Sequence, residues 1–222
     1  MKPVFVIADT HLPFVHRNYL DFCVETKRKN HCDKVIHIGD VCDMHSCSYH
    51  EHSPDGFSPK DEMDKCDRIL KQWFKAFPNV MVCRGNHDNL VSRKGKTAGL
   101  PSRCFKSFRE MWGYPKGWID DFEWIIDKVL YMHGTGFSGK NPALNCAVAH
   151  RMSAVVGHSH SVAGVKWTAS SRDIIFGMDV GCGLNRKSWA FNYGKDMPRK
   201  PILGCGVVYD NKNATFIPME MS

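Results

Sequence analysis

Three short apolar runs in the first half of the chain each end at a cluster of polar side chains. Residues 4–8, 35–38 and 80–83 are continuous and mostly apolar, which predicts β-strands buried on both faces. Helical periodicity occupies residues 19–29 and the stretch that opens at Ser58. This alternation predicts an α/β sheet, and ligand sites in such sheets lie beyond the carboxyl ends of the strands. The polar clusters therefore stand where a functional site is expected.

The stretch at Ser58 has the features of a helix start. Ser58 is a good N-cap, Pro59 suits the first turn, and Asp61 follows near the positive end of the helix dipole. After residue 120 the pattern changes to short strands, interrupted by one helix that opens at Asn141. We expect these strands to form a second, more antiparallel sheet packed on the first; they are residues 129–132, 154–156, 162–165, 173–176 and 206–209.

Five motifs contain the polar side chains, and each stands where a predicted strand ends. A mixture of carboxylates, one amide and several imidazoles suits two divalent cations held side by side, and imidazoles favour transition metals over calcium or magnesium. The two histidines of the last motif alternate along the chain, so their rings point to the same side of an extended segment. In chain order the motifs are Asp9-Thr10-His11, Gly39-Asp40-Val41-Cys42-Asp43, Gly85-Asn86-His87-Asp88, His133-Gly134 and Gly157-His158-Ser159-His160.

In order and content, these motifs resemble those of the calcineurin-like metallophosphoesterases, and the resemblance covers the chain from Asp9 to His160. It implies an α/β fold in which two mixed sheets form a sandwich flanked by helices, with the metals at one edge. It also implies that a metal-activated water hydrolyses phosphate esters between two metals about 3.5–4 Å apart. We expect a single metallophosphoesterase domain over residues 1–222, with loop insertions at about 44–58 and 89–118.

The resemblance implies a ligand set for two divalent transition-metal ions, with manganese as the first choice and iron, nickel or zinc as alternatives. Asp40 would bridge the ions, because a carboxylate has two oxygens. The first ion would take Asp9, His11, Asp40 and His160, and the second Asp40, Asn86, His133 and His158. Each of these residues alone is common in an ordinary turn or loop, but coincidence at every motif is a poor explanation of all of them together.

Two further residues have catalytic roles by the same resemblance. His87 follows the ligand Asn86 and is not itself a ligand in the family pattern; it would protonate the leaving oxygen or stabilise the phosphoryl group. Asp43 would pair with His87, orienting the ring and favouring its charged form. The alternative for Asp43 is a helix or turn cap. Asp88 is expected to bond backbone within its loop, and His37 to be a satisfied core histidine.

Substrate choice is expected to depend on the loops. Arg84 has a guanidinium that could reach a phosphate oxygen, and a plain surface arginine is the alternative. Tyr49, His50 and His52 could contact a base, ribose or second phosphate, or belong to a solvated loop. Related protein phosphatases have an arginine where this chain has Met44, which counts against a phosphoserine or phosphothreonine phosphatase.

The second insertion, residues 89–118, interleaves basic and aromatic residues, a mixture that suits nucleotides or single-stranded nucleic acid. Phe105, Phe108 and Trp112 also stand at helical spacing, and we favour a core face for them. A net charge of +7 favours polyanionic partners. The sequence thus leans to phosphodiesters of nucleotides or nucleic acid, with a monoesterase on nucleotides or phosphoproteins, or a non-catalytic interaction module, as alternatives.

Composition sets the remaining expectations. At 222 residues the chain is long enough for one domain with a real core. No apolar run is long enough to span a bilayer, and residues 1–9 are too short for a signal peptide. The ten cysteines form no Cys-x-x-Cys pair, so we expect reduced thiols, a cytoplasmic location and no membrane partner. Nothing in the sequence predicts an oligomeric state.

Overall fold

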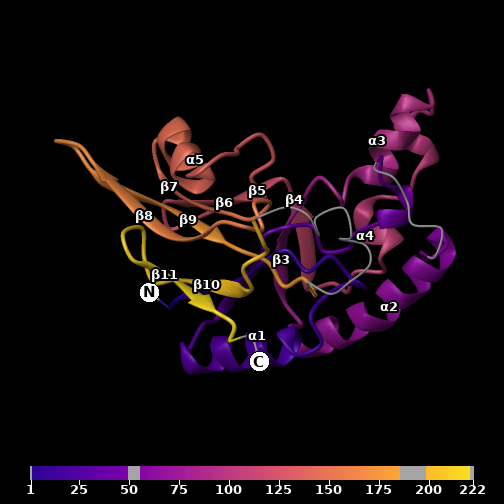
Figure 1. Cartoon of the computed structure of the whole chain (residues 1–222), viewed down its shortest axis with the longest axis horizontal. Coiled ribbons are helices and arrows are strands. Elements are labelled where there is room, and N and C mark those ends of the chain that lie inside the picture. Colours follow the sequence, from indigo (N-terminus) through magenta and orange to yellow (C-terminus); the bar gives the residue numbers. More distant parts are fainter. Residues whose placement is uncertain (1, 50–55, 186–198, 221–222) are drawn as a thin grey trace.

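Two mixed β-sheets pack against each other, with helices on their outer faces (Figure 1). The computed structural model describes residues 2–49, 56–185 and 199–220. The first sheet has the strand order β11-β10-β1-β2-β3-β4, in which β1 to β4 are parallel and β10 and β11 antiparallel. Its strands are β1 (Val4–Ile7), β2 (Lys34–His37), β3 (Val80–Cys83), β4 (Trp118–Asp121), β10 (Gly204–Val208) and β11 (Ala214–Pro218).

The second sheet has the order β5-β6-β7-β9-β8. The central strands β6, β7 and β9 run parallel, and the edge strands β5 and β8 are antiparallel to their neighbours. Polar motifs that follow β6 and β7 are therefore delivered to the same edge of this sheet. Its strands are β5 (Glu123–Ile126), β6 (Val129–Met132), β7 (Ser153–Val156), β8 (Ala163–Ala169) and β9 (Ile174–Val180).

Helices cover the outer faces of both sheets. On the first sheet, α1 is fixed by Tyr19, whose hydroxyl donates to the carbonyl of Gly204 at 2.7 Å, and α2 by Phe77, whose ring stacks on Phe5 of β1. On the second sheet, α5 packs small side chains against β7 and lies on the opposite side of the molecule from α1 in Figure 1. The helices are α1 (Tyr19–Lys29), α2 (Pro59–Ala76), α3 (Leu90–Thr97), α4 (Phe108–Met111) and α5 (Pro142–His150), with 3-10 turns at His45–Cys47 and Ser102–Cys104.

The start of α2 is as predicted. Ser58 accepts a hydrogen bond from the amide of Asp61 through its side chain, and Pro59 opens the first turn. Helix α2 then buries Leu70 and Trp73 against the first sheet, which explains the apolar stripe in its sequence. The three buried strands and the helix at Asn141 were also predicted correctly.

Several predictions about the later part of the chain were wrong. Residues 206–209 were assigned to the second sheet, but β10 pairs antiparallel with β1 in the first. Strands β4, β5 and β11 were not predicted. The aromatic spacing of Phe105, Phe108 and Trp112 does not come from one helix, because α4 has only 4 residues and Phe105 lies outside it. Trp112 is nevertheless buried, as the core interpretation required.

The expectation of ten reduced thiols was wrong for one pair. Cys42, in the second polar motif, forms a disulfide with Cys66 of α2, with their Cα atoms 6.7 Å apart. The other eight cysteines are free. The disulfide connects the loop after β2 to the helix that covers it. Among the helices of residues 2–49, 56–185 and 199–220, none combines the length and apolar character needed to cross a bilayer.

Candidate metal centre

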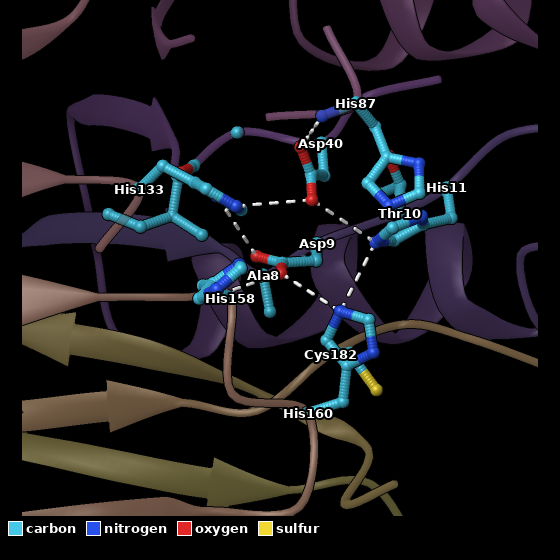
Figure 2. A network of polar contacts seen from close by, with 12 residues as sticks. Ala8, Asp9, Thr10, His11, Asp40, His87, His133, His158, His160 and Cys182 are labelled. Atoms are coloured by element: carbon cyan, nitrogen blue, oxygen red, sulfur yellow. Dashed lines mark hydrogen bonds and ion pairs between the residues drawn. The ribbon is translucent and has the colours of Figure 1, made fainter. Parts of the chain in front are cut away.

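The five polar motifs meet at the carboxyl ends of five strands. Asp9 follows β1, Asp40 follows β2 and Asn86 follows β3, while His133 follows β6 and His158 follows β7. In Figure 2, Asp9 and Asp40 lie between two groups of imidazoles, His133 with His158 on one side and His11 with His160 on the other. All seven predicted metal ligands are therefore close together, although they come from both sheets.

The first group surrounds the side chain of Asp9. Asp9 Oδ2 lies 3.2 Å from His160 Nε2 and accepts a hydrogen bond from the amide of His158 at 2.8 Å. His11 Nε2 and His160 Nε2 are 3.1 Å apart. Ligand atoms of Asp9, His11 and His160 all lie within 4.8 Å of one another, which is close enough for one ion to contact all three.

The second group surrounds the side chain of Asp40. Asp40 Oδ2 lies 3.1 Å from His133 Nε2 and 3.5 Å from His11 Nε2, so this one oxygen stands between the two groups. Asn86 Oδ1 is 3.0 Å from His133 Nε2. Asp40, His133 and His158 again have ligand atoms within 4.8 Å of one another. The carboxylate predicted to bridge two ions therefore lies between the two groups of predicted ligands, and the bridging role itself stays a prediction.

The polar atoms of the centre form a donor set that fits cations. His133 Nδ1 faces the carbonyl of Ile38 at 3.2 Å and can only donate to it, so Nε2 is the ring atom that faces the oxygens of Asp40 and Asn86. Asp9 Oδ1 is buried without a hydrogen-bond partner. Buried acceptors that face one another are costly unless positive charge lies between them. The oxygen and imidazole donors thus fit divalent transition metals.

The same crowding of charge shifts the pKa values of the centre. Burial opposes ionisation of Asp40, but His133 and His87 hold the pKa of that carboxyl well below its usual range. Burial likewise opposes protonation of His133, and the carboxylates of Asp40 and Asp9 overcome this and raise its pKa to about 9. Both pKa shifts have the same cause, because the buried carboxylates and the protonated imidazole stabilise each other's charge.

His87 and Asp43 pair as predicted. His87 Nδ1 lies 2.8 Å from Asp43 Oδ1, and the amide of His87 donates to Asp40 Oδ1 at 2.9 Å. Burial lowers the pKa of His87, but Asp40 and Asp43 outweigh it and raise that pKa to about 10. Asp43 Oδ1 also lies 3.3 Å from His11 Nδ1, a contact the sequence did not predict. One carboxylate therefore orients both a predicted ligand and the predicted acid.

Asp88 organises the loops beneath the centre. Its carboxylate accepts hydrogen bonds from the amides of Asp40, Val41 and Gly85 at 2.8–3.0 Å. This agrees with the structural role predicted for it. Burial and the nearby charge of Asp40 raise the pKa of Asp88 to about 7, while the amides of Gly85 and Val41 and the charge of His133 oppose that rise.

Two glycines give the carboxylates of the centre their space. A Cβ atom at Gly85 would lie 2.0 Å from Asp40 Oδ1, and one at Gly157 would lie 2.1 Å from Asp9 Oδ1. Contacts this short do not occur between real side chains. Gly85 of the third motif and Gly157 of the fifth are therefore part of the site, although they offer no ligand atom themselves.

Three predicted ligands adopt a backbone conformation that is unusual for residues with a side chain. His11, Asp40 and His158 have φ angles of 45°, 48° and 65°, in the left-handed region. Each such residue costs on the order of 1 kcal/mol or more and is found mainly at functional sites. Surrounding hydrogen bonds, including those of Asp88, hold this geometry.

His37 is the core histidine that the sequence predicted. Its Nδ1 accepts from the amide of Gly39 at 3.2 Å, so its Nε2 carries the proton and donates to Thr10 Oγ1 at 3.0 Å. Thr10 in turn donates to the carbonyl of Val41 at 2.8 Å. Burial lowers the pKa of His37 to about 3. This neutral chain of hydrogen bonds ties the loop after β1 to the loop after β2.

Of the four predicted substrate residues, the structure places Arg84 next to the centre. Arg84 bonds to the carboxylate of Asp120 on β4 and lies beside Asn86. Tyr49 is 56% exposed and its ring contacts Lys94 and Arg93 of α3. His50 and His52 fall outside the described residues. Contact of any of these four residues with a substrate stays a prediction.

Comparison with known proteins gives a consistent assignment. A family model for calcineurin-like phosphoesterases matches residues 2–178. Gene 54 protein of Mycobacterium phage L5 is 25% identical over 207 residues, which cover 84% of this chain and 81% of that protein. Two similar solved structures are a metallophosphoesterase from Sphaerobacter thermophilus (TM-score 0.49, 16% identity, 99% of this chain and 88% of that one) and Vps29 from Chaetomium thermophilum (0.46, 9%, 95% and 82%).

Proposed function

The chain belongs to the calcineurin-like phosphoesterase family, and we propose that it is a two-metal hydrolase that prefers phosphodiesters of nucleotides or nucleic acid. The observation that carries the proposal is the position of Asp40 Oδ2, which lies within 3.5 Å of one imidazole from each of the two ligand groups. The first ion takes Asp9, His11, Asp40 and His160, and the second Asp40, Asn86, His133 and His158. When bound, such ions stabilise the charge of a phosphoryl group and lower the pKa of a water.

His87 is the general acid of the proposed reaction. Its hydrogen bond through Nδ1 to Asp43 fixes the ring and leaves Nε2–H as the free donor. The side chain is 25% exposed beside the nearly buried ligands, so it can reach a substrate while touching the centre. From this place it donates a proton to the departing ester oxygen. Asp43 is a positioning residue, because it acts through the rings of His87 and His11.

The residue after Asp43, Met44, supports the preference for diesters. Met44 occupies the place of the arginine that the related protein phosphatases use, and it is buried. Position 44 therefore offers no cation to bind the additional charged oxygen of a monoester. The net charge of +7 suits a nucleotide or nucleic acid. Manganese as the bound metal and a cytoplasmic location stay predictions of the sequence.

Hydrolysis of two chromogenic esters tests the proposal. Purified protein with Mn²⁺ should cleave bis-p-nitrophenyl phosphate faster than p-nitrophenyl phosphate, and His87→Ala should lower kcat about 100-fold or more at unchanged metal content. Cleavage of the monoester alone would make the protein a phosphatase. A His87→Ala variant with full activity would contradict the acid assignment, and a metal-loaded protein without activity on either ester would contradict the hydrolase itself.

A further inference from the structure

A cavity of about 350 Å³ opens directly beside the centre. It shares Asn86 and His133 with the proposed second ion, so the cavity would adjoin an ester bound at that ion. Its volume is at the lower end of the range for small-molecule sites, about 300–1,000 Å³, which suits one nucleoside rather than a folded polymer. The residues that matter below are Arg84, Asn89, Arg93 and Phe122.

Phe122 and Arg84 both line this cavity and form a cation–π pair, called here the Phe122–Arg84 platform. Phe122 stands between β4 and β5 with 58% of its surface exposed, and its amide donates to Asp121 Oδ1 at 2.7 Å. The guanidinium carbon of Arg84 lies 5.1 Å from the centre of the Phe122 ring. Because the carboxylate of Asp120 holds Arg84, the guanidinium is fixed over the ring.

One arginine of the cavity is open to an anionic group of a ligand. Arg84 and Arg93 line the cavity together with the carboxylate of Glu123, and Arg84 is already paired with Asp120. Within the described residues, Arg93 has no carboxylate within 4.0 Å; its guanidinium carbon lies 5.7 Å from the Tyr49 ring. Asn89 adds an amide side chain to the lining, beside the two arginines.

We propose that this cavity is the nucleoside subsite of the enzyme, in which a nucleobase stacks on the Phe122–Arg84 platform beside Arg93. A nucleobase is planar and has polar edges, so it matches an aromatic face next to guanidinium and amide groups. Stacking of one base on an aromatic side chain contributes roughly 1–3 kcal/mol. The inference rests on the proposed function, because it places the substrate's scissile phosphate at the ions. It adds Phe122, Arg84 and Arg93 as the residues that select nucleotides among diesters.

Two diesters with the same leaving group isolate the nucleoside contribution. Thymidine 5′-(p-nitrophenyl phosphate) and methyl p-nitrophenyl phosphate both release p-nitrophenolate, so the ratio of their kcat/KM values measures recognition of the nucleoside alone. The unmodified protein should favour the thymidine ester, and Phe122→Ala should reduce that ratio about 10-fold. Phe122→Tyr keeps an aromatic face and should restore it.

Trp167 on β8 supplies a matched control. It is also a large exposed aromatic residue, at 49% exposure, and it does not line the cavity, so Trp167→Ala should leave the ratio as it is. The subsite is overturned if the unmodified protein shows no preference for the thymidine ester. It is equally overturned if Phe122→Ala leaves the ratio unchanged, whether or not both rates fall together.

Equilibrium binding separates failure of the subsite from failure of the proposed function. If neither diester is hydrolysed although metal is bound, the proposed function fails, and calorimetry then compares thymidine 5′-monophosphate with inorganic phosphate. Tighter binding of the nucleotide that is lost in Phe122→Ala supports the subsite even in an inactive protein. Equal binding of the two ligands, or no effect of Phe122→Ala, overturns it.

Discussion

The two sheets contribute different chemistry to the same centre. The edge of the first sheet supplies every predicted carboxylate and amide ligand together with His11, whereas the edge of the second supplies imidazoles only. Loops of the first sheet are fixed by a dense set of main-chain hydrogen bonds, with three amides on Asp88 alone. The imidazoles of the second sheet reach the centre through contacts between the sheets, such as His133 with the carbonyl of Ile38. The first sheet thus supplies the negative charge of the centre, and the second sheet supplies most of the imidazole nitrogens that face it.

The largest test removes the carboxylate that the two groups share. Asp40→Asn keeps the shape of the side chain but loses its charge and one of its two oxygens. We expect turnover to fall at least about 1,000-fold, because both proposed ions would lose their shared anionic ligand. Metal analysis of the purified variant should find fewer than two ions per chain. A variant that keeps both ions and normal turnover would remove Asp40 from the bridging position.

The next test acts through the positioning residue of the first sheet. Asp43→Asn should lower kcat about 10- to 100-fold, the effect typical of a lost partner of a ligand or acid. Because Asp43 contacts both His87 and His11, metal affinity should fall as well as turnover. Turnover and metal titrations distinguish this from a purely catalytic loss. If Asp43→Asn lowered turnover but left metal affinity unchanged, as expected for His87→Ala, the contact of Asp43 with His11 would not contribute to metal binding.

A third test asks whether the ions connect the two sheets. Ligands for each proposed ion come from both sheets, so metal should stabilise the folded chain as a whole. At a metal concentration about 100 times the dissociation constant the gain is about 2.7 kcal/mol, which corresponds to about 5–10 °C in Tm for a chain of this size. Thermal unfolding with Mn²⁺ and with a chelator measures it. An unchanged Tm in a protein shown to bind metal would mean that the sheets meet in the same way without ions.

The smallest expected effect concerns a carboxyl of the second sheet away from the centre. Burial raises the pKa of Asp179 on β9 to about 7, against the opposing effects of the Ala143 amide and Lys166. The folded chain therefore keeps a proton that the unfolded chain releases above about pH 4, and stability falls as the pH rises from 4 to 7.

Asp179→Asn should remove this contribution. Between pH 5 and pH 8 the unmodified chain should lose on the order of 1–3 kcal/mol more unfolding free energy than the variant. Urea unfolding of both proteins at the two pH values gives the difference. Parallel losses in the two proteins would show that Asp179 is ionised in the folded state.

The sequence predicted best where local chemistry decides the structure. Strand β1 could be recognised because it is buried on both faces, and the Asp9 and His11 motif after it because all five motifs occur together in one order. Pairing of β10 with β1 could not be recognised, since strand partners nearly the whole chain apart leave no local pattern. The contact of Asp43 with His11 and the exposure of Phe122 could not be predicted either. Both depend on how loops from different strands lie in space.

The glycines at positions 85 and 157 have a consequence for how this chain tolerates change. In a survey of every single substitution, the positions that abolish function are usually attributed to side chains that perform the chemistry. Here two positions without a side chain should be as intolerant as the ligands, because even one methyl group at either would displace the carboxylate of Asp40 or Asp9. Such a survey would therefore map the space that the carboxylates need as clearly as the carboxylates themselves.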